Sequence, residues 1–171
     1  SPVVYTSSTT FINSQTESSS ASGLSGVASL VGINLGGVSS GGDIPPTMYP
    51  QIGESVEFKR SLLKSTIDKK NQVKLGEFLS DYHNLDKSLH IDSKDKFYVS
   101  EYEDDLFDLI GEVISISVDQ KDGFITILAN MPNSEYAANT CINAREILQE
   151  TVINNKIKSA KEKLEYSKKQ L

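Results

Sequence analysis

The sequence predicts an α+β fold in which a small mixed or antiparallel sheet packs against helices and a long helix projects from this base domain at the end of the chain. Three observations predict it: residues 113–128 read as a β-hairpin, residues 134–171 repeat apolar side chains at helical spacing, and residues 2–13 are rich in β-branched and aromatic side chains. We expect the opening strand to pair with the hairpin in one domain over 1–171.

Two segments of alternating polarity around a turn predict the hairpin. Residues 113–118 alternate apolar and small polar side chains, which suits a half-buried strand, and residues 124–128 form the returning strand. Between them, Asp122-Gly123 favours a reversal because glycine accepts the positive φ that such a turn needs.

The long helix is predicted from an apolar stripe with a period of about 3.6 residues. Neither glycine nor proline interrupts the chain from Asn133 onward. A helix over 134–171 would be roughly 57 Å long at 1.5 Å per residue, longer than a small domain is wide, so we expect it to project. The stripe comprises Ala137, Cys141, Ala144, Leu148 and Val152, and Ile153, Ile157, Ala160, Leu164 and Leu171 continue it.

The Ser/Gly-rich segment 13–48 is expected to be a flexible loop, with a short helix at 24–30. Its glycines fail the phosphate-loop pattern because Val38 follows Gly37 where a lysine is required. Two interpretations of this apolar segment stay open. It is a flexible linker, or it is a contact surface, because monomers seldom expose such an apolar loop. The candidate oligomer or membrane-proximal contacts are Leu30, Gly32, Ile33, Leu35, Gly36 and Gly37.

Three shorter helices are predicted ahead of the hairpin. Apolar residues at helical spacing favour helices over 54–67 and 76–89, and a short one over 106–110 with acidic residues in its first turn. Tyr49-Pro50 predicts an extended approach to the first of them.

No catalytic, metal or cofactor site is predicted. His83 and His90 have no companion ligand at metal-binding spacing, and Cys141 falls on the apolar stripe, where a buried hydrophobe is expected. An EF-hand starting at Asp92 fails because Lys94 occupies its third position. A calcium- or ligand-binding module remains an alternative on the acidic cluster of Glu101, Glu103, Asp104, Asp105 and Asp108.

The charge and hydropathy patterns limit the partners and the membrane topology. With 17 Lys+Arg and 23 Asp+Glu the formal net charge is −6, so no general attraction to nucleic acid is expected. Within these residues we expect neither a signal peptide nor a membrane span, because no apolar run approaches the roughly 18 residues that a span needs.

The order and spacing of several segments resemble the periplasmic domain of the Wzz-type chain-length determinants, also called polysaccharide co-polymerases. The resemblance covers most of the chain and is poor over 69–109. The sequence also resembles the outer region of bacterial tyrosine autokinases of capsule and exopolysaccharide export. The segments that carry it are the strand 3–12, the run 24–37 (LSGVASLVGINLGG), the helix start 55–58 (SVEF), the strand pair around 119–123 and the helix from Pro132 to Leu171.

The resemblance implies a non-enzymatic regulator of O-antigen, capsular or exopolysaccharide chain length. It implies a homo-oligomer held in the bacterial inner membrane by flanking helices, with this part in the periplasm, acting with a membrane polysaccharide polymerase on lipid-linked glycan. The periplasmic adaptor region of an autokinase is the alternative. By this resemblance the chain is expected to be a truncated ectodomain whose projecting helix continues.

One departure from the family pattern concerns the start of the long helix. Met131 stands before the helix-opening Pro132, where such proteins commonly have an acidic residue. Asn130 or Asn133 is therefore expected to cap the helix, because an asparagine side chain can accept hydrogen bonds from the first free N–H groups.

Overall fold

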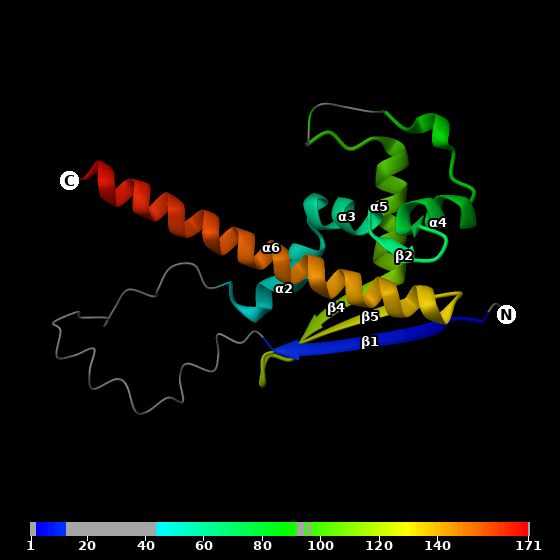
Figure 1. Cartoon of the computed structure of the whole chain (residues 1–171), viewed down its shortest axis with the longest axis horizontal. Coiled ribbons are helices and arrows are strands. Elements are labelled where there is room, and N and C mark those ends of the chain that lie inside the picture. Colours follow the sequence, from blue (N-terminus) through cyan, green and yellow to red (C-terminus); the bar gives the residue numbers. More distant parts are fainter. Residues whose placement is uncertain (1–2, 13–43, 92–94, 96, 171) are drawn as a thin grey trace.

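The computed structural model describes residues 3–12, 44–91, 95 and 97–170 and shows an α+β fold (Figure 1). A three-stranded sheet and a second, two-stranded sheet flank a long C-terminal helix. In chain order the elements are β1 (Tyr5–Ile12), the 3-10 helix η3 (Pro46–Met48), α2 (Tyr49–Gly53), α3 (Val56–Leu63), β2 (Thr66–Asp68), β3 (Val73–Lys74), α4 (Leu75–Tyr82), the 3-10 helix η4 (Lys87–Leu89), α5 (Glu101–Val113), β4 (Ile114–Val118), β5 (Phe124–Met131) and α6 (Ser134–Lys169).

The three-stranded sheet is antiparallel throughout and has the order β1-β5-β4. This confirms the prediction that the opening strand pairs with the hairpin. In the register Thr9 lies opposite Ile127, and Ile127 lies opposite Ile116. Alternate residues of the central strand point into the core, as the two-residue period requires. The buried residues of β5 are Ile125, Ile127, Ala129 and Met131.

Asp119 organises the hairpin turn between β4 and β5. Its carboxylate accepts hydrogen bonds from the backbone N–H groups of Lys121, at 2.8 Å, and Asp122, at 3.2 Å. Gly123 has a φ of +72°, the left-handed region that glycine enters without a steric cost. The predicted reversal at Asp122-Gly123 is therefore confirmed.

Helix α6 has 36 residues and begins where its cap dictates. The Asn133 side chain accepts hydrogen bonds from the N–H groups of Glu135, at 2.8 Å, and Tyr136, at 3.1 Å, which confirms one of the two expected caps. The first half of the predicted apolar stripe, from Ala137 to Val152, is buried against the domain. Beyond Val152 the helix extends away from the other elements (Figure 1).

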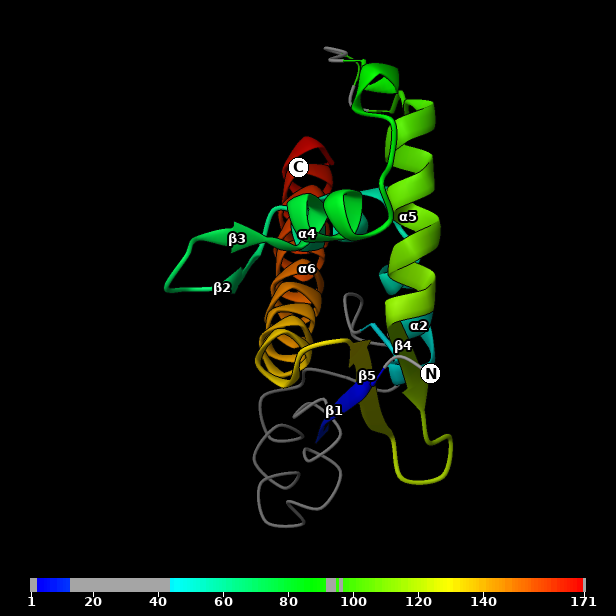
Figure 2. The ribbon, with the colours of Figure 1, turned by 90° about the vertical axis from the view of Figure 1, so that its right-hand side faces the viewer.

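The first half of α6 lies between two layers, as Figure 2 shows in a view nearly along the helix. On one side α6 contacts β1 and β5. On the other side the side-chain amides of Asn139 and Asn143 donate to the carbonyl oxygens of Ile67 and Thr66, at 2.8 and 2.9 Å. The buried apolar residues of both layers belong to one cluster, which includes Phe58, Leu62, Leu75 and Leu79 together with the buried residues of β5 and α6.

The helix predicted over 54–67 is wrong at its C-terminal end. Helix α3 ends at Leu63, where the Ser65 hydroxyl donates to the Leu62 carbonyl oxygen at 2.7 Å and so competes with a further helical turn. Ile67 instead lies in strand β2 and is fully buried. The short β2–β3 hairpin was not predicted.

The predicted helix over 76–89 is also too long. Helix α4 stops at Tyr82 because Asn84 adopts a positive φ of 54°, and the Leu85 N–H donates to the Ser80 carbonyl oxygen at 2.9 Å. This is the Schellman arrangement, in which a left-handed residue ends a helix.

Two further expectations fail near the predicted loop. Tyr49 is not extended: its φ of −60° and ψ of −41° are helical, and it opens α2 with Pro50 in the first turn, a position that tolerates a missing N–H. Of the predicted flexible segment 13–48, residues 46–48 form η3, and residues 13–43 lie outside the described part of the chain.

Substitutions on the two halves of α6 test where the helix leaves the domain. Leu148 is fully buried, so Leu148→Ala should lower the free energy of unfolding by about 2–5 kcal/mol. Ile153 is 55% exposed, so Ile153→Ala should change it by less than about 0.5 kcal/mol. Urea denaturation followed by circular dichroism measures both values, and equal losses would contradict the observed boundary.

Candidate functional site

The sequence-predicted contact residues cannot be placed in the structure. Leu30, Gly32, Ile33, Leu35, Gly36 and Gly37 all lie outside the described residues. The candidate site described here therefore comes from a pocket in the described part of the chain, which the sequence did not suggest.

This pocket, which we call the α3–α5 pocket, has a volume of about 360 Å³. It opens between the end of α3, the start of α4, the η4 segment and the first turns of α5. A volume of this order is typical of small-molecule sites, which combine an apolar lining with a few polar groups. Its lining residues are Arg60, Leu63, Lys64, Lys74, Gly76, Glu77, Lys87, His90, Tyr102, Glu103 and Leu106.

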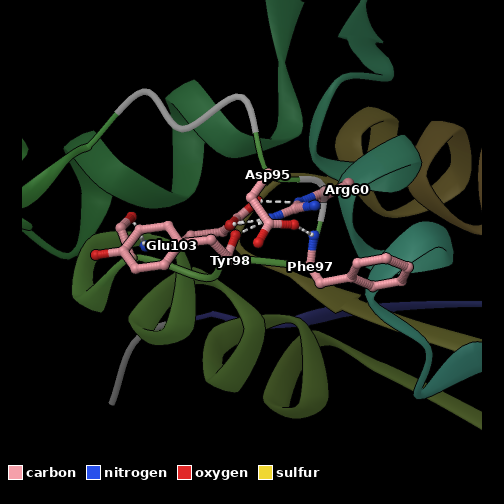
Figure 3. Close-up of polar contacts among 6 residues, drawn as sticks. Arg60, Asp95, Phe97, Tyr98 and Glu103 are labelled. Atoms are coloured by element: carbon pink, nitrogen blue, oxygen red, sulfur yellow. Dashed lines mark hydrogen bonds and ion pairs between the residues drawn. The ribbon is translucent and has the colours of Figure 1, made fainter.

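One wall of the pocket is a paired arginine that joins α3 to α5 (Figure 3). The Arg60 guanidinium donates from Nε to Glu103 Oε1 at 2.5 Å and from Nη2 to Glu103 Oε2 at 2.7 Å. Nη2 also donates to the backbone carbonyl oxygen of Tyr98 at 2.6 Å. Such a two-pronged pair fixes direction as well as distance, so it sets how the two helices meet.

The charge of Arg60 is held in place by acidic neighbours. Its pKa is raised, first by the hydrogen bond to Glu103 and further by the charges of Glu103 and Asp95, while partial burial opposes the shift. Asp95 in turn accepts a hydrogen bond from the Phe97 N–H at 2.9 Å. The Phe97 ring points away from this cluster (Figure 3) and is 80% exposed. The guanidinium is therefore a structural cation rather than a free ligand-binding group.

The α4 side of the pocket depends on close packing at Gly76. A Cβ at this position would lie 3.2 Å from the Leu63 carbonyl oxygen and 3.3 Å from Leu63 Cβ. The start of α4 therefore contacts the end of α3. As a result Lys64, after α3, and Lys74, before α4, line the same opening.

Ring and charge pairs surround the η4 side. Lys87 Nζ lies 2.7 Å from Asp81 Oδ1, and the two side chains are 62% and 69% exposed. His90 meets the Tyr102 ring edge to face, with centroids 5.6 Å apart. His83 makes a similar contact with Tyr82 at 5.2 Å. Both histidines are thus exposed residues in ring contacts.

The acidic cluster occupies the start of α5, as the sequence predicted for a helix N-terminus. Glu101, Glu103 and Asp104 lie in its first turn, and the Ser100 hydroxyl accepts from the Glu103 N–H at 3.3 Å. Across 3–12, 44–91, 95 and 97–170, no group of three or more His, Cys, Asp or Glu could hold a metal ion.

A second polar cluster, outside the pocket, ties the β2–β3 turn to α6. Asp68 accepts hydrogen bonds from the N–H groups of Lys70 and Asn71, at 3.0 and 2.9 Å, and from the Asn71 side chain at 2.8 Å. The Tyr136 hydroxyl donates to the same carboxylate at 3.3 Å. These bonds favour the charged form, those from Asn71 most of all, and they lower the Asp68 pKa.

Cys141 is a packed core residue, as expected from its place on the apolar stripe. It is 1% exposed, and its S–H donates to the Ile127 carbonyl oxygen at 3.3 Å. Burial raises the pKa of the thiol. A thiol in this setting is a poor nucleophile, because the thiolate is the reactive form.

The chain matches no protein-family model, no curated protein and no solved structure. None of the helices in the part that the structure describes, α6 included, combines the length and apolar character needed to cross a membrane.

The Arg60–Glu103 pair should be measurably coupled. Its side chains are 23% and 20% exposed, so a double-mutant cycle with Arg60→Ala and Glu103→Ala should give a coupling of about 1 kcal/mol in the free energy of unfolding. The matched control is the exposed Lys87–Asp81 pair, for which the coupling should be weaker because solvent screens the two charges. If the coupling energy of the Arg60–Glu103 pair were no larger than that of the control pair, the result would contradict the structural role of the Arg60–Glu103 pair.

Asp68 should make stability depend on pH at the acidic end. Because its folded-state pKa lies below the unfolded value of about 3.9, its contribution is complete above that value and is lost as pH falls through the folded pKa. Asp68→Asn should therefore lower stability at neutral pH and flatten the loss of stability as the pH falls below the unfolded-state pKa of about 3.9. Urea titrations at a series of pH values test this, and an unchanged pH slope would contradict it.

Proposed function

We propose that this chain is the periplasmic base of a non-enzymatic regulator of bacterial surface polysaccharide chain length. In this proposal it acts as a homo-oligomer anchored in the inner membrane, together with a polysaccharide polymerase and its lipid-linked glycan. The proposal starts from the resemblance of the sequence to the polysaccharide co-polymerases. The observation that carries it further is the uncovered apolar stripe on the second half of α6.

This stripe consists of side chains that the domain does not cover. Ile153, Ile157 and Leu164 are 55%, 48% and 57% exposed. With the exposed Ala160 they recur at intervals of four, three and four residues, the spacing by which a helix presents a continuous seam to another helix. A second helix that packed on this seam would remove these side chains from water, which is favourable by roughly 25 cal/mol per Å² of apolar surface.

The geometry of the domain suits such an assembly. The base holds the first half of α6 between two layers, so its direction is fixed by the core. The second half then extends beyond the base as a straight continuation of the same helix (Figure 1). If identical bases packed side by side, their helices would be brought close together with their seams available to one another.

The autokinase alternative uses the same periplasmic surfaces and differs in what lies in the cytoplasm. The calcium-module alternative has less support from the geometry. Glu103, in the middle of the acidic cluster, is already paired with Arg60 at 2.5 Å. A carboxylate that already satisfies a cation is a poor candidate for a calcium ligand.

The test is the assembly state of the gene-encoded protein that contains this chain, purified in detergent and measured by native mass spectrometry. We expect a closed oligomer. Ile157→Ser with Leu164→Ser should weaken it and shift the polysaccharide length distribution in a complementation assay. The matched control is Asn155→Ser with Glu162→Ser, which changes the opposite side of the same helix.

Two results would overturn this proposal. A strictly monomeric protein would remove the assembly on which it depends. A length distribution that both double variants leave unchanged at normal expression would separate the seam from chain-length control.

A further inference from the structure

The α3–α5 pocket carries unpaired positive charge in a chain whose formal net charge is −6. Four of its lining residues are lysines or arginine, and two of them are already neutralised: Arg60 by Glu103 and Lys87 by Asp81. Lys64 and Lys74 form no ion pair within the part of the chain that the structure describes. Among the described residues, the pocket therefore has two exposed lysines without an ion-pair partner beside one opening.

The acids of the pocket compensate its lysines only in part. Glu103 is occupied by Arg60 through both carboxylate oxygens. The Glu77 carboxylate accepts the backbone N–H of Lys74 at 3.3 Å, which satisfies a donor at the start of α4. Glu77 keeps its negative charge, so the lining holds four cationic side chains against two carboxylates, and this excess of positive charge favours an anionic ligand.

The remaining lining is apolar and includes a ring. Leu63 and Leu106 are buried and form the floor. Half-buried Tyr102, held edge to face against His90 at 5.6 Å, supplies an aromatic wall. An apolar floor with an aromatic wall suits the body of a compact ring compound, while a few convergent polar groups fix its orientation.

We propose that the α3–α5 pocket binds a sugar-sized ring compound that carries an anionic group, with Lys64 and Lys74 contacting the anion and Tyr102 contacting the ring. The anion is a carboxylate, as in a sugar acid, or a phosphate, as in a sugar phosphate; both satisfy two ammonium groups. The inference does not depend on the proposed function, because none of the pocket residues lies on α6.

Binding also has a structural consequence. A ligand in the pocket contacts the end of α3, the start of α4 and the first turns of α5 at once. These elements come from separate stretches of the chain, so the ligand favours the folded state over the unfolded one. The expected result is a rise in thermal stability that depends on ligand concentration.

The experiment is isothermal titration calorimetry of the 171-residue chain with four probes: glucuronate, glucose 6-phosphate, inorganic phosphate and glucose. We expect at least one of the two sugar anions to bind, more tightly than inorganic phosphate, and glucose not to bind. Added salt should weaken the binding, since the contacts to the lysines are electrostatic. Which sugar anion binds distinguishes a carboxylate from a phosphate.

Matched variants locate the binding. Lys64→Gln with Lys74→Gln should weaken it by tenfold or more, because both charge-assisted contacts to the anion are removed. The control is Lys161→Gln with Lys163→Gln, the same charge change on exposed positions of α6. Circular dichroism verifies that each variant is folded.

Three outcomes would overturn the inference. One is the absence of binding by both sugar anions. Another is an equal loss of affinity in the pocket and control variants, which would indicate a general charge effect. The third is binding of inorganic phosphate as tight as that of the sugar anions, which would leave the ring without a role.

Discussion

The packing of α6 onto the central strand β5 is the constraint on which the rest of the structure depends. Small side chains at Ala137, Cys141 and Ala144 let the helix approach the sheet closely, and Ala129 does the same from the strand. The opposite flank of α6 holds the β2–β3 hairpin through Asn139 and Asn143. Neither layer alone encloses a core, so both require the helix between them.

The sequence predicted the elements whose hydrophobic period was long and unambiguous. The hairpin and the long helix fall in this class, since 36 residues without glycine or proline leave few alternatives. The strand β2 was missed because Ile67 also fits the helical spacing of Leu63, four residues before it. What makes it a strand is a tertiary contact: the carbonyl oxygens of Thr66 and Ile67 accept from α6, far away in sequence.

The candidate site could not be predicted from the sequence for a related reason. Arg60 and Glu103 lie on different helices and are paired only after α3 and α5 pack together. Locally, Glu103 belongs to an acidic run that suits a helix N-terminus, and Arg60 to a polar helix face. The role of Gly76 could not be predicted either, because this glycine allows the close approach of α4 to Leu63 and does not form a turn.

The two halves of α6 differ in what stabilises them. The buried half is held by the core, and it nucleates the helix, so the exposed half needs only to propagate. Propagation explains why residues beyond Val152 remain helical without covering contacts, but it does not explain why Ile153, Ile157 and Leu164 are large and apolar. Polar residues would serve equally well on an isolated helix. The uncovered seam on a helix whose direction is fixed by its domain is the observation behind the proposed assembly, and it is separate from the charged pocket formed by α3, α4 and α5.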